Sequence, residues 1–88
     1  MNKRRDIVPN NLKEYRLKCG LTQKQVAQYL GLTNEVSICH WEQGKNIPNL
    51  FNLFKLSNLY AISSEELYSQ TVASIKRELL LNYPDKDI

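Results

Sequence analysis

Apolar residues recur at intervals of three and four positions along most of this sequence, and stretches that alternate between polar and β-branched apolar residues are missing. That interval is typical of an amphipathic helix, whereas a half-buried strand would repeat every two residues. A chain of 88 residues can build only one compact core. The sequence therefore predicts a single all-α domain.

Capping residues and glycines indicate where the helices begin and end. A first helix over about 11–19 should stop at Gly20, because glycine readily takes the left-handed conformation after a helix. Thr22 and Gln25 have the spacing of a capping box and should open a second helix, which Gly31 ends. We expect four further helices: one from an Asn34 cap to about Gln43, one from an Asn49 cap, a short one at a second capping box over 63–66, and an amphipathic one over about 70–83.

Apolar positions within these helices predict the core. The expected inward residues lie mostly three or four positions apart in each helix. They are Leu12, Tyr15 and Cys19 in the first helix, Val26, Ala27 and Leu30 in the second, Ile38 and Trp41 in the third, and Leu50, Leu53, Leu56 and Leu59 in the fourth.

Charge is distributed unevenly along the chain. Residues 1–45 hold eight Lys and Arg against four Asp and Glu, a balance of +4, whereas residues 46–88 hold four against five, a balance of −1. The first half is therefore the candidate for an anionic partner, although a solvated charged face would give the same balance.

Other features of the composition argue against several classes of protein. Cys19, Cys39 and a single histidine are too few for a zinc site, and the two cysteines are compatible with a disulfide or, in a reducing cytoplasm, with free thiols. Scattered carboxylates without a glycine-rich phosphate loop argue against an enzyme. No segment has membrane-spanning length, and Asp6 and Pro9 stand where a secretory signal would be apolar. We expect a cytoplasmic protein without a metal, a cofactor or a small-molecule ligand.

The third expected helix has two different sides. Ile38 and Trp41 share one side, and the other side is polar and mixed in chemistry. Two helices joined by a tight turn, the second exposing such a side, form the geometry that places side chains in the DNA major groove. Because helix pairs occur in any bundle, this geometry alone only suggests DNA binding. The residues of the outer side are Glu35, Val36, Cys39, His40 and Gln43.

A set of residues at fixed spacings runs through the first five expected helices. It comprises the segments 12–16, 20–23 and 62–67, the pairs Val26-Ala27, Leu30-Gly31, Trp41-Glu42 and Gly44-Lys45, and Ile38, Pro48, Leu50, Leu53 and Leu56. This set resembles the phage repressor and Cro family of helix-turn-helix domains, the XRE-like family, over roughly residues 11–69. The resemblance implies a five-helix, lambda-repressor-like domain, to which an amphipathic C-terminal helix is added. The stretch between Gly31 and Gly44 is one residue longer than the commonest family pattern, and we place the extra residue in the turn.

Four residues on the outer side of the third helix are the expected contacts to base edges: Glu35, Val36, Cys39 and His40. His40 can donate to guanine, Glu35 can accept from a cytosine amino group, and Val36 can pack on a thymine methyl. Simpler interpretations remain open: Glu35 complementing the helix dipole, His40 as a solvated histidine, and Cys39 as a small spacer.

Positions around these four residues are expected to hold the DNA backbone or to brace the fold. The expected phosphate contacts are Gln23, Ser37, Gln43, Lys45 and Asn46. Lys3, Arg4 and Arg5 form either an arm along a groove or a solvated terminus. Arg16 and Glu42 occupy positions that often form an ion pair in the resembling family, and two independent surface charges are the alternative.

Three segments follow from these expectations: a basic arm over 1–10, a helix-turn-helix domain over 11–69 and a helical extension over 70–88. One helix reads too few base pairs to find a site, so a homodimer on paired half-sites of double-stranded DNA is expected. The apolar stripe of Val72, Ile75, Leu79 and Tyr83 either makes that dimer or folds back on its own core.

The sequence predicts a transcriptional regulator, most simply a repressor. The alternative is a protein-interaction module that resembles an antitoxin or a coactivator.

Overall fold

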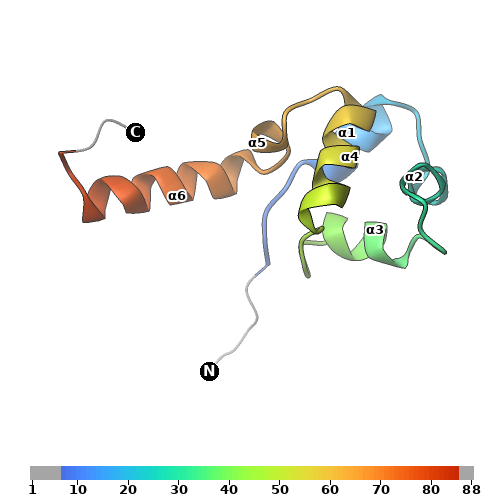
Figure 1. The fold of residues 1–88 in the computed structure, drawn as a ribbon, viewed down its shortest axis with the longest axis horizontal. Coiled ribbons are helices and arrows are strands. Elements are labelled where there is room, and N and C mark those ends of the chain that lie inside the picture. The colour runs from blue at the N-terminus through green and yellow to red at the C-terminus, as the bar shows by residue number, and fades with distance from the viewer. Residues whose placement is uncertain (1–6, 86–88) are drawn as a thin grey trace.

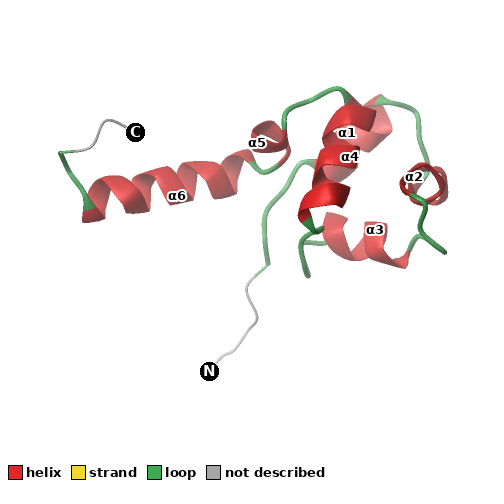
Figure 2. Ribbon diagram, in the orientation of Figure 1, coloured by secondary structure: helices red, strands yellow, loops and turns green. Residues whose placement is uncertain are grey.

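The computed structural model describes residues 7–85 and folds them into six α-helices without a strand. Helices α1 to α5 gather around one core, and α6 extends away from them (Figures 1 and 2). The prediction of an all-α fold, with a five-helix domain and an added C-terminal helix, is confirmed. The helices are α1 (Leu12–Lys18), α2 (Gln23–Leu30), α3 (Val36–Glu42), α4 (Leu50–Tyr60), α5 (Ser64–Leu67) and α6 (Ser69–Asn82).

Side-chain caps set the beginnings of three helices. At α2, the Gln25 N–H donates to Thr22 Oγ1 at 3.0 Å and the Thr22 N–H donates to Gln25 Oε1 at 2.9 Å. Asn49 and Ser63 each accept a hydrogen bond from the backbone N–H three residues later, at 2.8 and 3.0 Å. These bonds satisfy N–H groups that have no partner within the first turn of a helix. Helices α2, α4 and α5 therefore begin where the sequence predicts.

The third helix begins later than predicted. Asn34 was expected as its cap, but α3 starts at Val36 with Glu35 in the cap position, and the Glu35 side chain makes no capping bond. Asn34 Oδ1 instead accepts from the Val36 N–H at 2.9 Å, a bond across two residues that belongs to a turn. The turn between α2 and α3 accordingly covers residues 31–35.

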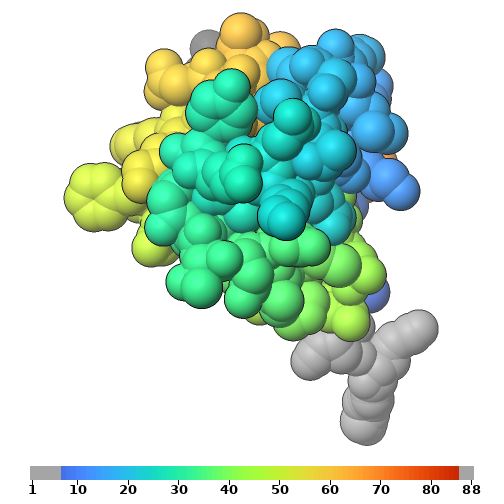
Figure 3. All heavy atoms as spheres, turned by 90° about the vertical axis from the view of Figure 1, so that its right-hand side faces the viewer, coloured from blue at the N-terminus to red at the C-terminus, as the bar shows by residue number. Residues whose placement is uncertain are grey.

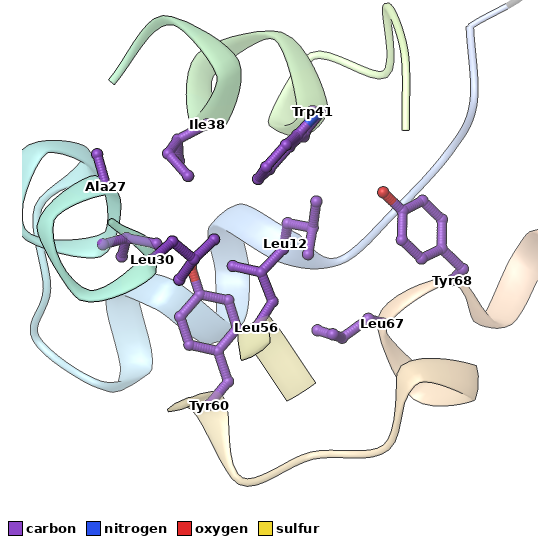
Figure 4. Packing of buried hydrophobic residues seen from close by; sticks show 10 residues of the cluster. Leu12, Ala27, Leu30, Ile38, Trp41, Leu56, Tyr60, Leu67 and Tyr68 are labelled. Atoms are coloured by element: carbon purple, nitrogen blue, oxygen red, sulfur yellow. The ribbon is translucent and has the colours of Figure 1, made fainter. Parts of the chain in front are cut away.

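The core joins one side of each of the first five helices (Figure 4). Most of the predicted inward residues are buried, including Ile38 and Trp41 of α3. Cys19 is an exception, because it lies exposed at the C-terminal end of α1, and Tyr15 is only half-buried. The buried apolar residues are Leu12, Val26, Ala27, Leu30, Ile38, Trp41, Leu56, Tyr60, Leu67 and Tyr68.

The inward face of α4 differs from the prediction. Leu50 is 60% exposed, Leu53 and Leu59 are half-buried, and Tyr60 is buried beside Leu56. Residues at strict three-residue steps drift by about 60° per step around a helix of 3.6 residues per turn. Leu50 and Leu59, nine residues apart, therefore point in opposite directions, whereas Leu56 and Tyr60, four apart, share one face.

Helix α6 leaves the domain immediately after α5. Its 14 residues include none that is buried, and it runs away from the other helices in Figure 1. It begins one residue before the predicted start, and Tyr83 lies just beyond its last residue. The described residues thus leave most of the surface of α6 open.

Candidate nucleic-acid interface

Helices α2 and α3 pack together and present one face of the molecule, which Figure 3 shows from the front. The inner side of α3 is buried through Ile38 and Trp41. Its outer side begins with Val36, which is 53% exposed. Within residues 7–85, no segment of the chain lies over this side in Figure 3, and Figure 1 shows α6 at the opposite end of the molecule. Among these residues the outer side of α3 is therefore uncovered.

The four expected base contacts lie at the start and along this outer side. Glu35 and Val36 are exposed where the turn meets α3, and Cys39 and His40 are half-buried one turn further on. Glu35 precedes the first helical residue, so its side chain projects from the turn rather than from the helix. The structure brings these four residues to one surface.

The five expected backbone contacts flank the same surface. Ser37 lies exposed in the first turn of α3, while Gln43, Lys45 and Asn46 lie exposed just after its last residue. Gln23 lies at the first position of α2 and is half-buried. Donors are thus available near both ends of the α3 surface.

A buried ion pair lies behind the α2–α3 face. Arg16 Nε donates to Glu42 Oε2 at 2.6 Å and Arg16 Nη2 donates to Glu42 Oε1 at 3.1 Å, and the two side chains are only 8% and 4% exposed. Arg16 Nη1 donates to the carbonyl of Leu21 at 2.9 Å. The bond to Glu42 raises the pKa of Arg16 above its ordinary value, against a smaller opposing effect of burial. The geometry is the two-pronged pairing that suits a guanidinium and a carboxylate.

Gln23 takes part in this pair in a way that the sequence did not indicate. Its Nε2 donates to Glu42 Oε1 at 2.9 Å, so Glu42 receives three side-chain hydrogen bonds. The network ties the first residue of α2 and the last residue of α3 to α1. It therefore fixes how the two helices of the pair are oriented. No sequence pattern would have predicted this bond, because it depends on the packing of two helices.

The segment before α1 is attached to the far end of α3. The Val8 N–H donates to the carbonyl of Gly44 at 2.9 Å, and Asn10 Nδ2 donates to the carbonyl of Trp41 at 3.0 Å. Gly44 has φ +77, and a Cβ there would lie 2.5 Å from the carbonyl oxygen of Val8. The expected arm residues Lys3, Arg4 and Arg5 lie outside the described residues, but the segment that follows them runs beside the exposed end of α3.

Neither a metal cluster nor a membrane span emerges from the part of the chain that the structure describes. No group of three or more His, Cys, Asp and Glu residues comes together between residues 7 and 85. No helix in that range is long and apolar enough to cross a membrane.

A helix pair with a buried brace behind it and an open outer side on its second helix defines a helix-turn-helix domain. Residues 12–67 match the family model described as Helix-turn-helix, and the chain belongs to this family. The family membership predicted from the residues is confirmed, and the matched range lies within the predicted domain.

Three curated relatives are similar to this chain. It is 40% identical over 72 residues to the HTH-type transcriptional regulator ImmR of Bacillus subtilis. The matched stretch covers 81% of this chain and 56% of ImmR. It is 35% identical over 74 residues to the SPbeta prophage-derived uncharacterized HTH-type transcriptional regulator YonR of the same organism, covering 84% and 68%. It is 34% identical over 59 residues to an uncharacterized HTH-type transcriptional regulator of Methanocaldococcus jannaschii, covering 67% and 88%. The chain thus spans little more than half the length of ImmR.

Proposed function

We propose that this protein is a sequence-specific, double-stranded DNA-binding transcriptional regulator that acts as a repressor and binds as a homodimer. One observation carries the proposal: no described residue covers the outer side of α3, while the Arg16–Glu42–Gln23 network behind it holds α2 and α3 in a defined orientation. The family match and the printed names of three relatives support regulation of transcription. Catalysis has no part in this proposal.

Sequence recognition in this proposal comes from the outer side of α3. Val36 is apolar and exposed, which suits contact with a thymine methyl group. His40 can donate to guanine N7 or O6, and Glu35 can accept from a cytosine amino group at the edge of the site. Cys39 is small and half-buried between them and allows the helix to approach the bases closely.

Phosphate contacts would position the helix without selecting a sequence. Lys45 and Asn46 are exposed immediately after α3, and Ser37 and Gln43 are exposed at its two ends. Gln23 has one amide N–H engaged with Glu42, so only its second N–H is available for a phosphate. Affinity should therefore fall steeply with salt, because each neutralised phosphate releases counterions.

A second candidate function, binding of another protein, is favoured by the apolar surface of α4. Phe51 is 75% exposed and Phe54 is 50% exposed, and both lie outside the α2–α3 face. Large exposed aromatic residues are frequent at protein–protein contacts. Under this alternative, affinity for DNA would be low or would require the partner.

Selection of bound sequences from random duplex DNA tests the proposal. We expect one enriched sequence, and a palindromic sequence if the protein binds as a dimer. Val36→Glu should abolish the enrichment, because it replaces the apolar contact to a thymine methyl with a carboxylate facing the base edges. Leu81→Glu adds the same charge at a 77% exposed position on α6 and should leave the selected sequence unchanged.

Each outcome of the selection bears on a separate part of the proposal. Failure of the folded chain to enrich any sequence would overturn the DNA-binding function and favour the protein-binding alternative. A single enriched sequence without symmetry would overturn the dimer but leave sequence recognition intact.

A further inference from the structure

The peptide group between Gly44 and Lys45, just after α3, is held at both of its ends. Its carbonyl accepts a hydrogen bond from the Val8 N–H at 2.9 Å, and its N–H donates to the His40 carbonyl at 3.0 Å. We call these two bonds the peptide clamp. Because both polar atoms of the peptide group are bound, the backbone that carries the Lys45 side chain has a fixed position at the end of the α3 surface.

Asn10 holds the segment that supplies one half of the peptide clamp. Its side chain is half-buried, and its Nδ2 donates to the carbonyls of Val8 at 3.1 Å, Trp41 at 3.0 Å and Glu42 at 3.4 Å. The last two carbonyls belong to the final turn of α3, where no further turn of the helix supplies a donor. One amide group therefore ties Val8 to the end of α3, within reach of Gly44.

The oxygen of the same side chain has a separate role. Asn10 Oδ1 accepts from the N–H of Leu12, the first residue of α1, at 3.0 Å. This bond caps α1, whereas the bonds from Nδ2 to α3 span 31 and 32 residues of sequence. A substitution can separate the two roles. Serine keeps an acceptor for the cap, but its single hydroxyl is too short to bond both α3 carbonyls.

We propose that Asn10 is a positioning residue for DNA binding: by holding Val8 at the end of α3, it fixes Lys45 where that side chain meets a phosphate. Asn10 itself touches no DNA in this arrangement. Lys45 is exposed, so without the peptide clamp its backbone has to be ordered when DNA binds, and that ordering lowers affinity. This inference rests on the proposed function and names how one of its phosphate contacts is preorganised.

Asn11 offers a matched control, because it is the same residue type at the next position. Its Nδ2 donates to the Glu66 carbonyl at 2.8 Å and to Ser69 Oγ at 3.2 Å. These bonds lead to α5 and to the first residue of α6, not to α3. Asn11→Ser thus removes long-range amide bonds of the same kind and leaves the peptide clamp intact.

The first test is a double-mutant cycle in DNA affinity between Asn10→Ser and Lys45→Ala. Affinity of the 88-residue chain for the duplex enriched in the selection is measured at one salt concentration. Asn10→Ser alone should weaken binding about 10-fold, because the backbone at Lys45 must then be ordered on the DNA. In the Lys45→Ala chain the same change should weaken binding less than about 3-fold, since no lysine is left to position. Asn11→Ser should change affinity less than about 2-fold in either chain.

Competition between duplexes that differ by one base pair gives a second measurement. Asn10→Ser should weaken binding to all of them by the same factor, because a phosphate contact carries no direct sequence information. A changed base preference would contradict the proposal, since it would place the effect of Asn10 on the base-reading side of α3.

Hydrogen exchange of the Lys45 amide tests the peptide clamp without DNA. In Asn10→Ser this amide should exchange at least about 5-fold faster, through local opening of the segment. In Asn11→Ser it should exchange as in the original chain. Urea unfolding compares the stabilities of the two serine variants, so that a local effect is separated from global unfolding. If Asn10→Ser does not fold, Asn10→Asp and Asn11→Asp replace the serine pair, because Asp caps a helix as well as Asn and its carboxylate donates no hydrogen bond.

The outcomes separate the positioning role from the proposed function. An equal loss of affinity from Asn10→Ser with and without the Lys45 side chain overturns the positioning role. An unchanged exchange rate of the Lys45 amide, or equal effects of Asn10→Ser and Asn11→Ser on DNA affinity, overturn it as well. In each of these cases an enriched sequence in the DNA selection would still support the regulator. A folded chain that enriches no sequence would overturn the proposed function, and the positioning role with it.

Discussion

Glu42→Ala should strongly destabilise the domain, because Glu42 neutralises the buried guanidinium of Arg16. The carboxylate accepts three hydrogen bonds, at 2.6 and 3.1 Å from Arg16 and at 2.9 Å from Gln23. Removing one partner of a buried ion pair costs about 3–5 kcal/mol. We expect about 3 kcal/mol, the lower end of that range, because Arg16 keeps its hydrogen bond to the Leu21 carbonyl.

This loss is large for a domain of this size. The free energy of unfolding of a native protein is only about 5–15 kcal/mol. In a domain of this size, each kcal/mol of lost stability lowers the melting temperature by about 4–8 °C. Glu42→Ala should therefore lower the melting temperature by about 12–24 °C. Replacing both partners by Met should recover most of the loss, because two apolar side chains leave no unpaired charge.

Urea unfolding followed by fluorescence measures the effect directly. Trp41 is the single tryptophan of the chain and is buried, so its emission reports on the core next to Glu42. Glu14→Ala is the matched control, because Glu14 pairs with Lys18 at 3.4 Å with both side chains more than half exposed. That change should cost at most about 0.5 kcal/mol. A cost for Glu42→Ala below 1 kcal/mol, or equal to that of the control, would refute the argument from the buried charge.

Four further predictions concern the α3 surface and two special positions. His40→Ala should relax preference at one base step at a cost of about 1–3 kcal/mol, measured by competition between duplexes; an unchanged preference would mean that His40 touches no base. Lys45→Ala should weaken binding to all sequences alike and reduce the salt slope by about one. Gly44→Ala should cost about 1–3 kcal/mol of stability, because a Cβ at φ +77 would collide with the segment before α1; a neutral change would show that the segment is not held there. Burial raises the pKa of Tyr68 to about 12, whereas the unfolded phenol ionises near 10. The free energy of unfolding should therefore be maintained below pH 10 and fall between pH 10 and 12, and the fall should be smaller in Tyr68→Phe.

Local signals in the sequence predicted most of the helix boundaries. The Thr22 capping box and the Asn49 and Ser63 caps act within three residues of chain, so their partners are known as soon as the sequence is known. The outer side of α3 was also predictable. Once Ile38 and Trp41 are assigned to the core, the helical period leaves Val36 and His40 on the other side.

Features that depend on neighbouring helices were harder to predict. Leu50 has the same spacing to its neighbours as a core residue but is exposed, because the direction of α4 is set by the helices on which it packs. Gln23 was expected at a phosphate, and its additional bond to Glu42, 19 residues away in sequence, was not predicted. Asn10 was not singled out, yet it joins the segment before α1 to the end of α3.

The sequence by itself determined that this protein is helical, that it belongs to the helix-turn-helix family and that α3 has an outer side of mixed chemistry. These properties follow from the periodicity of apolar residues and from caps that act within one turn. Only the tertiary structure decided how α2 and α3 are braced through Glu42, which side of α4 is exposed and that α6 extends away from the domain. Contacts between residues distant in the chain arise from the packing of whole helices, and packing depends on every side chain in the core at once.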